Sequence, residues 1–455
     1  MSIIVFSLFF SWLLAFPFEG QVLYAITDLF NIDAHTMIFS SIAAHFVGLF
    51  SCGFFIKTRK QTKRLMIFSI IFCMIGSIPF FFSPSIIWNI SLLSSSFVAG
   101  LCVAAWGFYF KSYTPSNERI KTAADVLIYS NILMIIINMI AINLSPYVGL
   151  AFSILILGVT LFFQIKLPGN MEADTQNNKI ESKNTVNAVK PLVFLCFFIV
   201  VITIDSGLMY QVINPTFEHH EWLTSWYWAV PYIIALYIMK NLPKKINRNY
   251  ILYVGIAMIG FSFIAFMLLD YSASSYLVVG ACGVYDLFWW SILGEMLDFD
   301  DNPAKILGIG LSANVLGVLI GGVIGNIIVT MGAKYSTSML ALVVVFLTLM
   351  ILPLLHKQLS ILLKNHVYLT TLYEMVPTKQ SETIDNFIMT RKLTQRESEI
   401  AALLLKGRTY KMIANELYLS ENTVKTHIKN IYSKFNVQSK TELMNLLMEK
   451  EHIID

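Results

Sequence analysis

Long apolar runs are the feature that most constrains how this chain folds. A helix needs about 20 predominantly apolar residues to cross the hydrocarbon layer of a membrane. The first 357 residues contain twelve runs of about this length, near 3–26, 36–57, 65–83, 86–110, 122–142, 146–166, 191–211, 222–240, 250–269, 275–297, 306–329 and 336–356. Because lipid offers no hydrogen-bond partners, each run must satisfy its backbone groups internally. The sequence therefore predicts twelve membrane-spanning helices.

Composition supports a membrane-embedded chain. Of the 455 residues, 56% are hydrophobic and 13% are charged, whereas a soluble domain carries about 25% charged residues. The five cysteines lie in apolar runs without C-x-x-C spacing, which predicts small buried side chains and neither a metal site nor a disulfide framework. No metal or cofactor is expected. The first run lacks the basic flank of a signal peptide and is predicted to remain as the first span.

Lysine and arginine residues gather in the even-numbered connections between spans. The second connection carries Lys57, Arg59, Lys60, Lys63 and Arg64, the fourth Lys111, Arg119 and Lys121, the sixth Lys179, Lys183 and Lys190, and the eighth Lys240, Lys244, Lys245 and Arg248. Lys334 is the exception among the odd-numbered connections. By the positive-inside rule, this asymmetry predicts a multi-pass protein of the bacterial cytoplasmic membrane with both termini in the cytoplasm. The segment after the last span would then lie on the side where bacterial DNA is.

The spans divide into two groups of six. The sixth connection, GNMEADTQNNKIESKNTVNAVK, is the longest polar stretch between spans. Three marks recur at a separation of 184 residues: Arg64 and Arg248, the Met-Ile-Gly triplets that begin at Met74 and Met258, and Trp106 and Trp290. Because these marks fall in equivalent spans of the two halves, they favour a duplicated bundle.

This organisation resembles the major facilitator superfamily over residues 1–357, which implies a bundle of two six-helix halves. The loop after span two departs from the family pattern. The family carries a Gly-x-x-x-Asp-Arg signature there, whereas this loop reads GFFIKTRKQTKR and has Gly53 and the basic residues but not the acid. In the family that acid helps latch the two halves during alternating access, so its loss argues against transport.

Ionisable residues inside the spans are candidates for function, because burying them in lipid is costly. These residues are Glu19, His45, Asp205, Asp286 and Glu295. No lysine or arginine lies deep in any span, so several alternatives are open for the carboxyl groups. They are protonated, hydrogen-bonded to Asn or Tyr, exposed to a water-filled cavity, or paired with a ligand that is cationic or donates hydrogen bonds.

A small-molecule pocket between the halves is the functional interpretation of these groups. Its candidate ligand residues are Glu19, Asp205, Asp286, Trp106, Trp289 and Trp290. Aromatic side chains suit the wall of a cation pocket, and the alternative for aromatic residues is packing or a belt at the membrane interface. In span eleven, Gly317, Gly321 and Gly325 follow a four-residue spacing that favours close helix packing over a hinge.

Residues 358–390 connect the last span to the tail. The first part, LSILLKNHVYLTTLYEMV, has apolar residues at helical spacing and is expected to continue the last span or to lie along the inner leaflet. The second part, PTKQSETIDNFIMTRK, is polar and is predicted to be a linker.

Residues 391–455 show the pattern of soluble helices. Thr394 and Glu397 form a capping box at a helix start, and Gly407 suits the end of that helix. A second helix follows, and Ser420 caps a third. A fourth helix is predicted over about residues 440–450.

The third helix of the tail, SENTVKTHIKNIYSKF, has two faces. The residues that repeat at helical spacing and are predicted to pack inward are Val424, Ile428, Ile431 and Phe435. The basic ridge on another face comprises Lys425, Thr426 and Lys429, flanked by His427 and Lys434. One buried seam and one basic, hydrogen-bonding ridge suit the major groove of DNA. The alternative is a solvated basic face.

The stretch resembles the LuxR-type helix-turn-helix family over residues 391–452. The matching residues are Leu393-Thr394-Gln395-Arg396-Glu397, Gly407, Ile413, Ala414, Leu417, Ser420, Thr423, Val424, Lys425, His427, Ile431, Lys434, Phe435 and Leu443, with Phe435 standing where the family usually has leucine. The resemblance implies a four-helix domain whose third helix enters the major groove and whose last helix serves dimerisation. By position, it implies that Lys425, Thr426 and Lys429 face bases, and that His427 and Lys434 lie near the DNA backbone. Thr423 belongs to the same predicted set.

The sequence thus predicts an all-α protein of three parts: a membrane sensor domain over 1–357, a juxtamembrane helix and linker over 358–390, and a LuxR-type DNA-binding domain over 391–455. The favoured function is a membrane-bound one-component transcription regulator. Its expected partners are double-stranded DNA, membrane lipid, an unknown small molecule and a second copy of the chain. The alternatives are a secondary transporter with a DNA-binding regulatory tail and a passive tether for DNA. No phosphate loop, metal spacing or nucleophile motif favours an enzyme.

Overall fold

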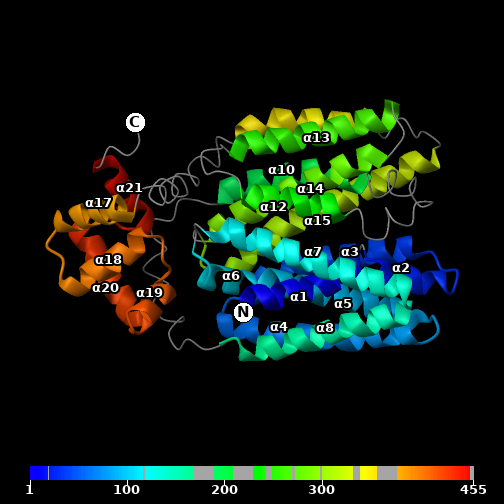
Figure 1. Ribbon diagram of the computed structural model, residues 1–455, viewed down its shortest axis with the longest axis horizontal. Helices are drawn as coiled ribbons and strands as arrows, with labels where there is room; N and C mark the ends of the chain where they lie inside the picture. The colour runs from blue at the N-terminus through cyan, green and yellow to red at the C-terminus, as the bar shows by residue number, and fades with distance from the viewer. Residues whose placement is uncertain are drawn as a thin grey trace.

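The computed structural model describes the chain except residues 19, 116–117, 169–188, 209–228, 242–247, 269–271, 298–299, 332–338, 356–376 and 451–455. Every regular element in the described part is a helix. Figure 1 shows a large bundle of long helices and a smaller group of helices at one of its ends. The predicted fold class, an all-α membrane bundle followed by a small helical domain, is confirmed.

Each predicted span corresponds to an apolar helix. The labelled elements are α1 (Ser2–Ala15), α2 (Gln21–Asp28), α3 (Ala34–Phe55), α4 (Arg59–Ser77), η1 (Ile78–Phe81), α5 (Ile86–Ala105), α6 (Gly107–Tyr113), α7 (Arg119–Asn143), α8 (Pro146–Lys166), α10 (Val189–Leu208), α12 (Ala229–Lys240), α13 (Arg248–Leu268), α14 (Ser272–Met296) and α15 (Pro303–Thr330). The helix Met339–Leu355 follows. Eight helices of the described part are long and apolar enough to cross a membrane, and four apolar helices are shorter.

The first span is broken, which corrects the prediction of one continuous helix. Helix α1 ends at Ala15 and α2 begins at Gln21. Pro17 lies in the break, and proline ends helices because it has no N–H and its ring clashes with the preceding turn. Two backbone groups at the break find partners on other helices. Ser41 Oγ donates to the carbonyl oxygen of Pro17 at 2.8 Å, and the N–H of Gln21 donates to Asn138 Oδ1 at 3.1 Å.

The two halves meet in a symmetric pattern. Helices α1–α8 form one half and α10–α15 lie in the other (Figure 1). Across the interface α3 packs on α15, and α7 packs on α12. Helices α3 and α15 are spans two and eleven, and α7 and α12 are spans five and eight. Adding six converts span two to span eight and span five to span eleven, so the two contacts are equivalent under the repeat. The arrangement supports the duplicated bundle that the 184-residue repeat predicts.

Small residues bring α15 and α10 close together. A Cβ atom on Gly317 or Gly321 would collide with backbone carbonyl oxygens of α10, at Val200 and Ile204 respectively. The close-packing role predicted for Gly317 and Gly321 is therefore confirmed, because their missing side chains permit this approach.

The smaller group of helices comprises α17 (Pro377–Met389), α18 (Gln395–Leu405), α19 (Tyr410–Glu416), α20 (Glu421–Phe435) and α21 (Lys440–Lys450). It has a hydrophobic core of its own, separate from that of the bundle. The capping box of Thr394 and Glu397 is present at the start of α18. Gly407 has a positive φ of 80° at the end of that helix, a conformation that favours glycine.

Helix α17 corrects the prediction of a linker over PTKQSETIDNFIMTRK. Its buried apolar residues, Ile384, Phe387 and Ile388, belong to the core of the C-terminal domain. The Phe387 ring stacks on the Phe435 ring with centroids 4.9 Å apart. The segment is polar on average, but its three apolar residues recur at i, i+3 and i+4, the spacing of one helical face. The aromatic residue at 435 thus has a partner in α17.

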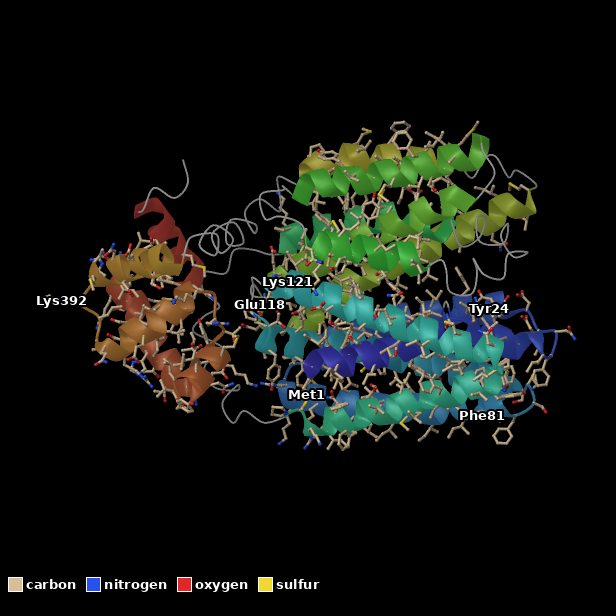
Figure 2. All side chains as sticks on the ribbon, viewed as in Figure 1. Met1, Tyr24, Phe81, Glu118, Lys121 and Lys392 are labelled. Carbon is tan, nitrogen blue, oxygen red and sulfur yellow. The ribbon has the colours of Figure 1, made fainter. Side chains whose placement is uncertain are left out.

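The C-terminal domain adjoins the bundle end that carries the N-terminus. Figure 2 shows Met1, Glu118 and Lys121 at this end, and Tyr24 and Phe81 at the opposite end. We call these the proximal and distal ends of the bundle. The N-terminus and the basic connection at Lys121 therefore lie on the same side as the tail.

The contribution of α17 predicts the stability of C-terminal fragments. A fragment of residues 377–455 should be more stable than one of residues 391–455 by roughly 2–4 kcal/mol, because burial of three large apolar side chains exceeds the entropy cost of ordering the helix. Urea unfolding measures the difference. Phe387→Ala should remove most of the gain, whereas Met389→Ala, at a position that is 80% exposed, should leave it intact. Equal stabilities of the two fragments would contradict a structural role for α17.

Candidate nucleic-acid interface and buried polar groups

Helix α20 is positioned by caps at both ends. Ser420 Oγ accepts a hydrogen bond from the N–H of Thr423 at 3.1 Å, which satisfies a free donor of the first turn. Asn436 ends the helix in the left-handed conformation, with φ of 56°. The Thr423 hydroxyl lies 2.7 Å from Ser420 Oγ. This predicted DNA-contacting residue therefore also belongs to the cap.

The inward seam of α20 is as predicted. Val424, Ile428, Ile431 and Phe435 are all buried in the core of the C-terminal domain. On the opposite ridge, Thr426 and Lys429 are exposed, while Lys425 and His427 are half-buried. Thr426 Oγ1 donates to the carbonyl oxygen of Asn422 at 3.0 Å, so its oxygen remains an acceptor. The ridge presents a basic, hydrogen-bonding surface next to a rigid core.

Lys434 differs from the rest of the predicted DNA-binding set. Its Nζ donates to Glu397 Oε2 at 2.6 Å, and Glu397 also accepts from the N–H of Thr394 at 2.8 Å. The ammonium group therefore joins α20 to the capping box of α18. In the structure this side chain makes a contact within its own domain, whereas the resemblance implied a position near the DNA backbone.

The Glu397 carboxyl is held in its charged form by these contacts. Burial raises its pKa, but the hydrogen bonds from Lys434 and Thr394 outweigh burial and place the net pKa below the ordinary value of 4.5. A lowered pKa in the folded state stabilises the fold above the unfolded pKa. That contribution is lost as the pH falls through the folded-state value.

Two further basic residues have roles that the sequence analysis missed. Arg396 in α18 donates to Glu399 and to the carbonyl oxygen of Leu417, both at 2.6 Å, and so ties α18 to the turn before α20. Lys411 in α19 donates from Nζ to the hydroxyl of Tyr113 at 2.7 Å. Tyr113 belongs to the bundle, so no signal in the sequence pairs these two residues.

Helix α21 packs on its own domain. Leu443, Met444 and Leu447 are buried in the core, and Leu446 is partly buried against it. The leucines that suggested an apolar side on this helix therefore lie in the core of their own domain, where α21 packs on α18 and α20. Dimerisation through α21 stays a prediction.

Trp106 and Trp290 meet at the interface between the two halves. Their ring centroids are 6.3 Å apart, and Phe6 stacks on Trp106 at 4.2 Å. Trp106 Nε1 donates to Ser2 Oγ at 3.0 Å. Both tryptophans are buried. They pack against each other across the interface, as members of a repeated pair would, and the indole N–H of Trp106 already has a partner.

Asp205 on α10 is a buried carboxyl that has no hydrogen-bond partner in the part of the chain that the structure describes. It is 0% exposed, and neither of its oxygens is hydrogen-bonded. The Tyr285 hydroxyl and Trp289 Nε1 on α14 are also buried and unpartnered. Asp205 and Tyr285 lie within electrostatic range, and the two aromatic rings stack with centroids 6.1 Å apart. The structure therefore gathers three unsatisfied polar groups inside the second half.

The other ionisable candidates of the bundle differ from Asp205. Asp286 Oδ2 accepts from the Tyr232 hydroxyl at 2.5 Å. His45 Nδ1 lies 3.2 Å from the carbonyl oxygen of Ser96. Glu19 lies outside the described residues. Among the described residues, no group of three or more His, Cys, Asp or Glu side chains is arranged to hold a metal ion.

The pairing of Lys434 with Glu397 predicts an altered acid stability. Lys434→Met keeps most of the aliphatic stem and should destabilise the C-terminal domain by about 1–3 kcal/mol at neutral pH, because a buried carboxylate loses a donor. Acid unfolding should begin at a higher pH in this variant because it starts from a lower stability, and the difference in stability from the wild type should shrink as the pH falls through the pKa of Glu397, where the contribution of the pair is lost. Circular dichroism across a pH series measures both effects. Lys429→Met, at an exposed site, is the control, and identical acid unfolding of the two variants would contradict the pairing.

Comparison with known proteins assigns the C-terminal domain. The sequence model of a family described as "Bacterial regulatory proteins, luxR family" matches residues 391–447. The transcriptional regulatory protein LiaR of Bacillus subtilis is 38% identical over 71 residues, which cover 16% of this chain and 33% of LiaR. DegU of Brevibacillus brevis is 46% identical over 50 residues, covering 11% and 21%. The chain thus spans a third or less of the length of these curated relatives.

The bundle matches solved structures by shape. The proton:xylose symporter XylE, of the major facilitator superfamily, superposes with a TM-score of 0.60 at 12% identity, covering 78% of this chain and 95% of that one. The human organic anion transporter MFSD10 superposes with a TM-score of 0.57 at 11% identity, covering 77% and 97%. At such identities the likeness concerns the fold alone. The chain therefore combines a membrane bundle of major-facilitator-like fold with a C-terminal helix-turn-helix domain of the LuxR family of bacterial regulators.

Proposed function

We propose that this protein is a membrane-bound one-component transcription regulator. In this proposal α20 reads promoter DNA, and the bundle senses a small molecule. The observation that carries the proposal is the basic ridge of α20, held by a complete LuxR-type core at the proximal end of a bundle with a transporter-like fold. A LuxR-type domain binds DNA, and in this proposal it lies on the cytoplasmic side of the membrane, where DNA is.

The orientation of the bundle supports this assignment. The N-terminus and the basic residue Lys121 lie at the proximal end, next to the DNA-binding domain (Figure 2). Positively charged connections favour the cytoplasmic face of a membrane. We therefore place both termini in the cytoplasm of a bacterium.

The proposed reading residues are Lys425, Thr426 and Lys429, with Thr423 and His427 beside them. Arginine and lysine side chains contact guanine edges in the major groove, and threonine hydroxyls contact several bases. One reading helix covers few base pairs, so a useful operator requires two copies of the domain. We propose that the protein binds its operator as a homodimer.

The proposed ligand site surrounds Asp205. A buried carboxyl without a partner is costly in a membrane protein, and Tyr285 and Trp289 add two unsatisfied donors on the neighbouring helix. A ligand with a cationic or donor group for Asp205 and an acceptor for the two aromatic side chains would satisfy all three. This chemistry points to a small amine that also carries an acceptor atom.

Exchange of Lys429 tests the DNA-binding part. Lys429→Ala should weaken binding to a promoter fragment by roughly 1–3 kcal/mol, or about 5- to 150-fold, if the side chain contacts a base. Electrophoretic mobility shift or fluorescence anisotropy measures the loss. The matched control is Lys392→Ala, which removes an equal charge at an exposed site between α17 and α18 (Figure 2). Equal losses in both variants would indicate a nonspecific charge effect and contradict base reading.

Exchange of Asp205 tests the sensing part. In detergent, an amine that is a ligand should raise the melting temperature of the protein, because binding at 100 times Kd stabilises the native state by about 2.7 kcal/mol. Asp205→Asn should abolish this increase, whereas Asp33→Asn, at an exposed carboxyl between α2 and α3, should retain it. The site assignment fails if an amine stabilises both variants equally.

A secondary transporter with a regulatory tail is the second candidate, favoured by the fold that the bundle shares with XylE and MFSD10. Membrane vesicles distinguish the two functions. Transport predicts substrate accumulation that is lost in an Asp286→Asn variant and unchanged in Lys425→Ala. Sensing predicts a ligand response of a reporter gene in the full chain that is absent from the fragment 377–455.

A further inference from the structure

A contact between a lysine and a tyrosine joins helix α19 of the DNA-binding domain to the bundle. Lys411 is the second residue of α19, and its Nζ donates to the Tyr113 hydroxyl at 2.7 Å. The same nitrogen lies 3.9 Å from the centroid of the Tyr113 ring. Tyr113 ends α6, and α6 and α19 contact each other. The C-terminal domain is therefore docked on the proximal end of the first half.

Tyr113 also contacts a second cation, the guanidinium group of Arg59. The Arg59 guanidinium donates to the Tyr113 hydroxyl and lies 4.8 Å from the ring centroid. Burial and the nearby Arg59 lower the pKa of Lys411, and Glu421 raises it, with a net value of about 8. The docked lysine thus faces a second positive charge in a partly dry site. Such a contact is easily exchanged for one with a negatively charged partner.

The docked lysine lies on the side of the domain that DNA approaches. In helix-turn-helix domains the first helix of the motif crosses the phosphate backbone, while the start of the second helix contacts bases. Here α19 is the first helix and α20 the second. Glu421, the first residue of α20, lies close enough to Lys411 to raise its pKa. The bundle therefore lies next to the N-terminal end of α20, the end that would contact bases.

The docking residues adjoin the contacts that close the two halves. Lys111, two residues before Tyr113, donates to the carbonyl oxygen of Asp300 in the second half at 3.0 Å. Asn302 donates to the carbonyl oxygen of Ile56, three residues before Arg59, at 3.0 Å. Separation of the halves at the proximal end would break both bonds and move α6 and the start of α4.

Two more contacts close the halves at the proximal end. Arg119 donates to the carbonyl oxygen of Gly294 at 2.6 Å, and Lys240 forms an ion pair with Asp125. Each bond joins α7 in the first half to a helix of the second half. The surface that holds Lys411 is therefore built on a closed proximal end.

We propose that the proximal surface formed by Tyr113 and Arg59 is a docking site for the DNA-binding domain of the same chain, and that docking and DNA compete for Lys411. The docked arrangement is the DNA-free state, and separation of the halves at the proximal end releases the domain. The inference rests on the proposed function, because it concerns regulation of the same DNA-binding surface.

Affinity for DNA in the full-length protein tests the competition. The protein is reconstituted in lipid nanodiscs and titrated with a promoter duplex of about 30 base pairs, long enough for two half-sites. Tyr113→Ala should bind the duplex roughly 5-fold or more tightly than the wild type, because it removes the docking partner but no DNA contact. Tyr129→Ala, on an exposed tyrosine of α7, should bind as the wild type does. Equal affinities of the Tyr113 and Tyr129 variants would overturn the proposal.

Cross-linking gives a second test that does not depend on whether the Tyr113→Ala variant folds. A protein with Ser112→Cys and Met412→Cys, which are neighbours of the contact and leave Tyr113 and Lys411 in place, should form a cross-link with a bifunctional thiol reagent, and the yield should fall as duplex is added. The cross-linked protein should lose duplex binding. Unchanged yield at saturating duplex would overturn the competition.

The full-length Lys429→Ala variant separates the two levels of failure. If it binds the duplex as the wild type does, DNA reading by α20 fails, and the proposed function fails with it. If it loses binding while Tyr113→Ala shows no gain, the proposed function stands and only the docking inference is wrong.

Discussion

The absence of hydrogen-bond partners in lipid governs this structure. It forces each apolar run into a helix, and it requires a partner for every backbone group that a break exposes. The break at Pro17 persists because Ser41 and Asn138, from other helices, reach the freed groups. The side chains of Ser41 and Asn138 are thus engaged with backbone groups of the broken first span. Packing and polar satisfaction are coupled, since the donors must arrive on neighbouring helices.

Several buried polar groups of the bundle have no hydrogen-bond partner among the described residues, and Asp205 is the carboxyl among them. Its oxygens, the Tyr285 hydroxyl and Trp289 Nε1 are buried without hydrogen bonds, whereas the indole of Trp106 in the interface has a partner. The need to satisfy polar groups in lipid explains the hydrogen bonds of Ser41 and Asn138. It does not explain why Asp205, Tyr285 and Trp289 are buried without partners. Groups that weaken a fold are retained where they serve function. We therefore propose that this unpartnered carboxyl, together with Tyr285 and Trp289, makes the second half the sensing part.

Local patterns predicted much of the fold, and long-range pairs explain the rest. Apolar length located the spans, and the Thr394–Glu397 box and Ser420 located helix starts, because each signal lies within a few residues. Helix α17 was missed because Phe387 needs Phe435, 48 positions later, to reveal its buried face. The acceptor of Lys434 likewise lies on another helix. In the bundle, the equal spacing of Trp106 and Trp290 signalled a repeat, but only the structure shows the two rings in contact.

Three lysines of the C-terminal domain show why charge alone does not identify a DNA interface. Lys434 is held by a buried carboxylate, Lys411 by a phenol beside a second cation, and Lys429 is exposed on the ridge. A side chain contributes to DNA affinity only by the difference between phosphate or base contact and its partner in the free protein. Glu397 is a strong competitor for Lys434, because the carboxylate is buried and charged. Tyr113 is a weak one, since Arg59 shares its hydroxyl. An equilibrium between docked and DNA-bound forms is therefore most easily set at Lys411, where the bundle and the nucleic acid meet the same helix.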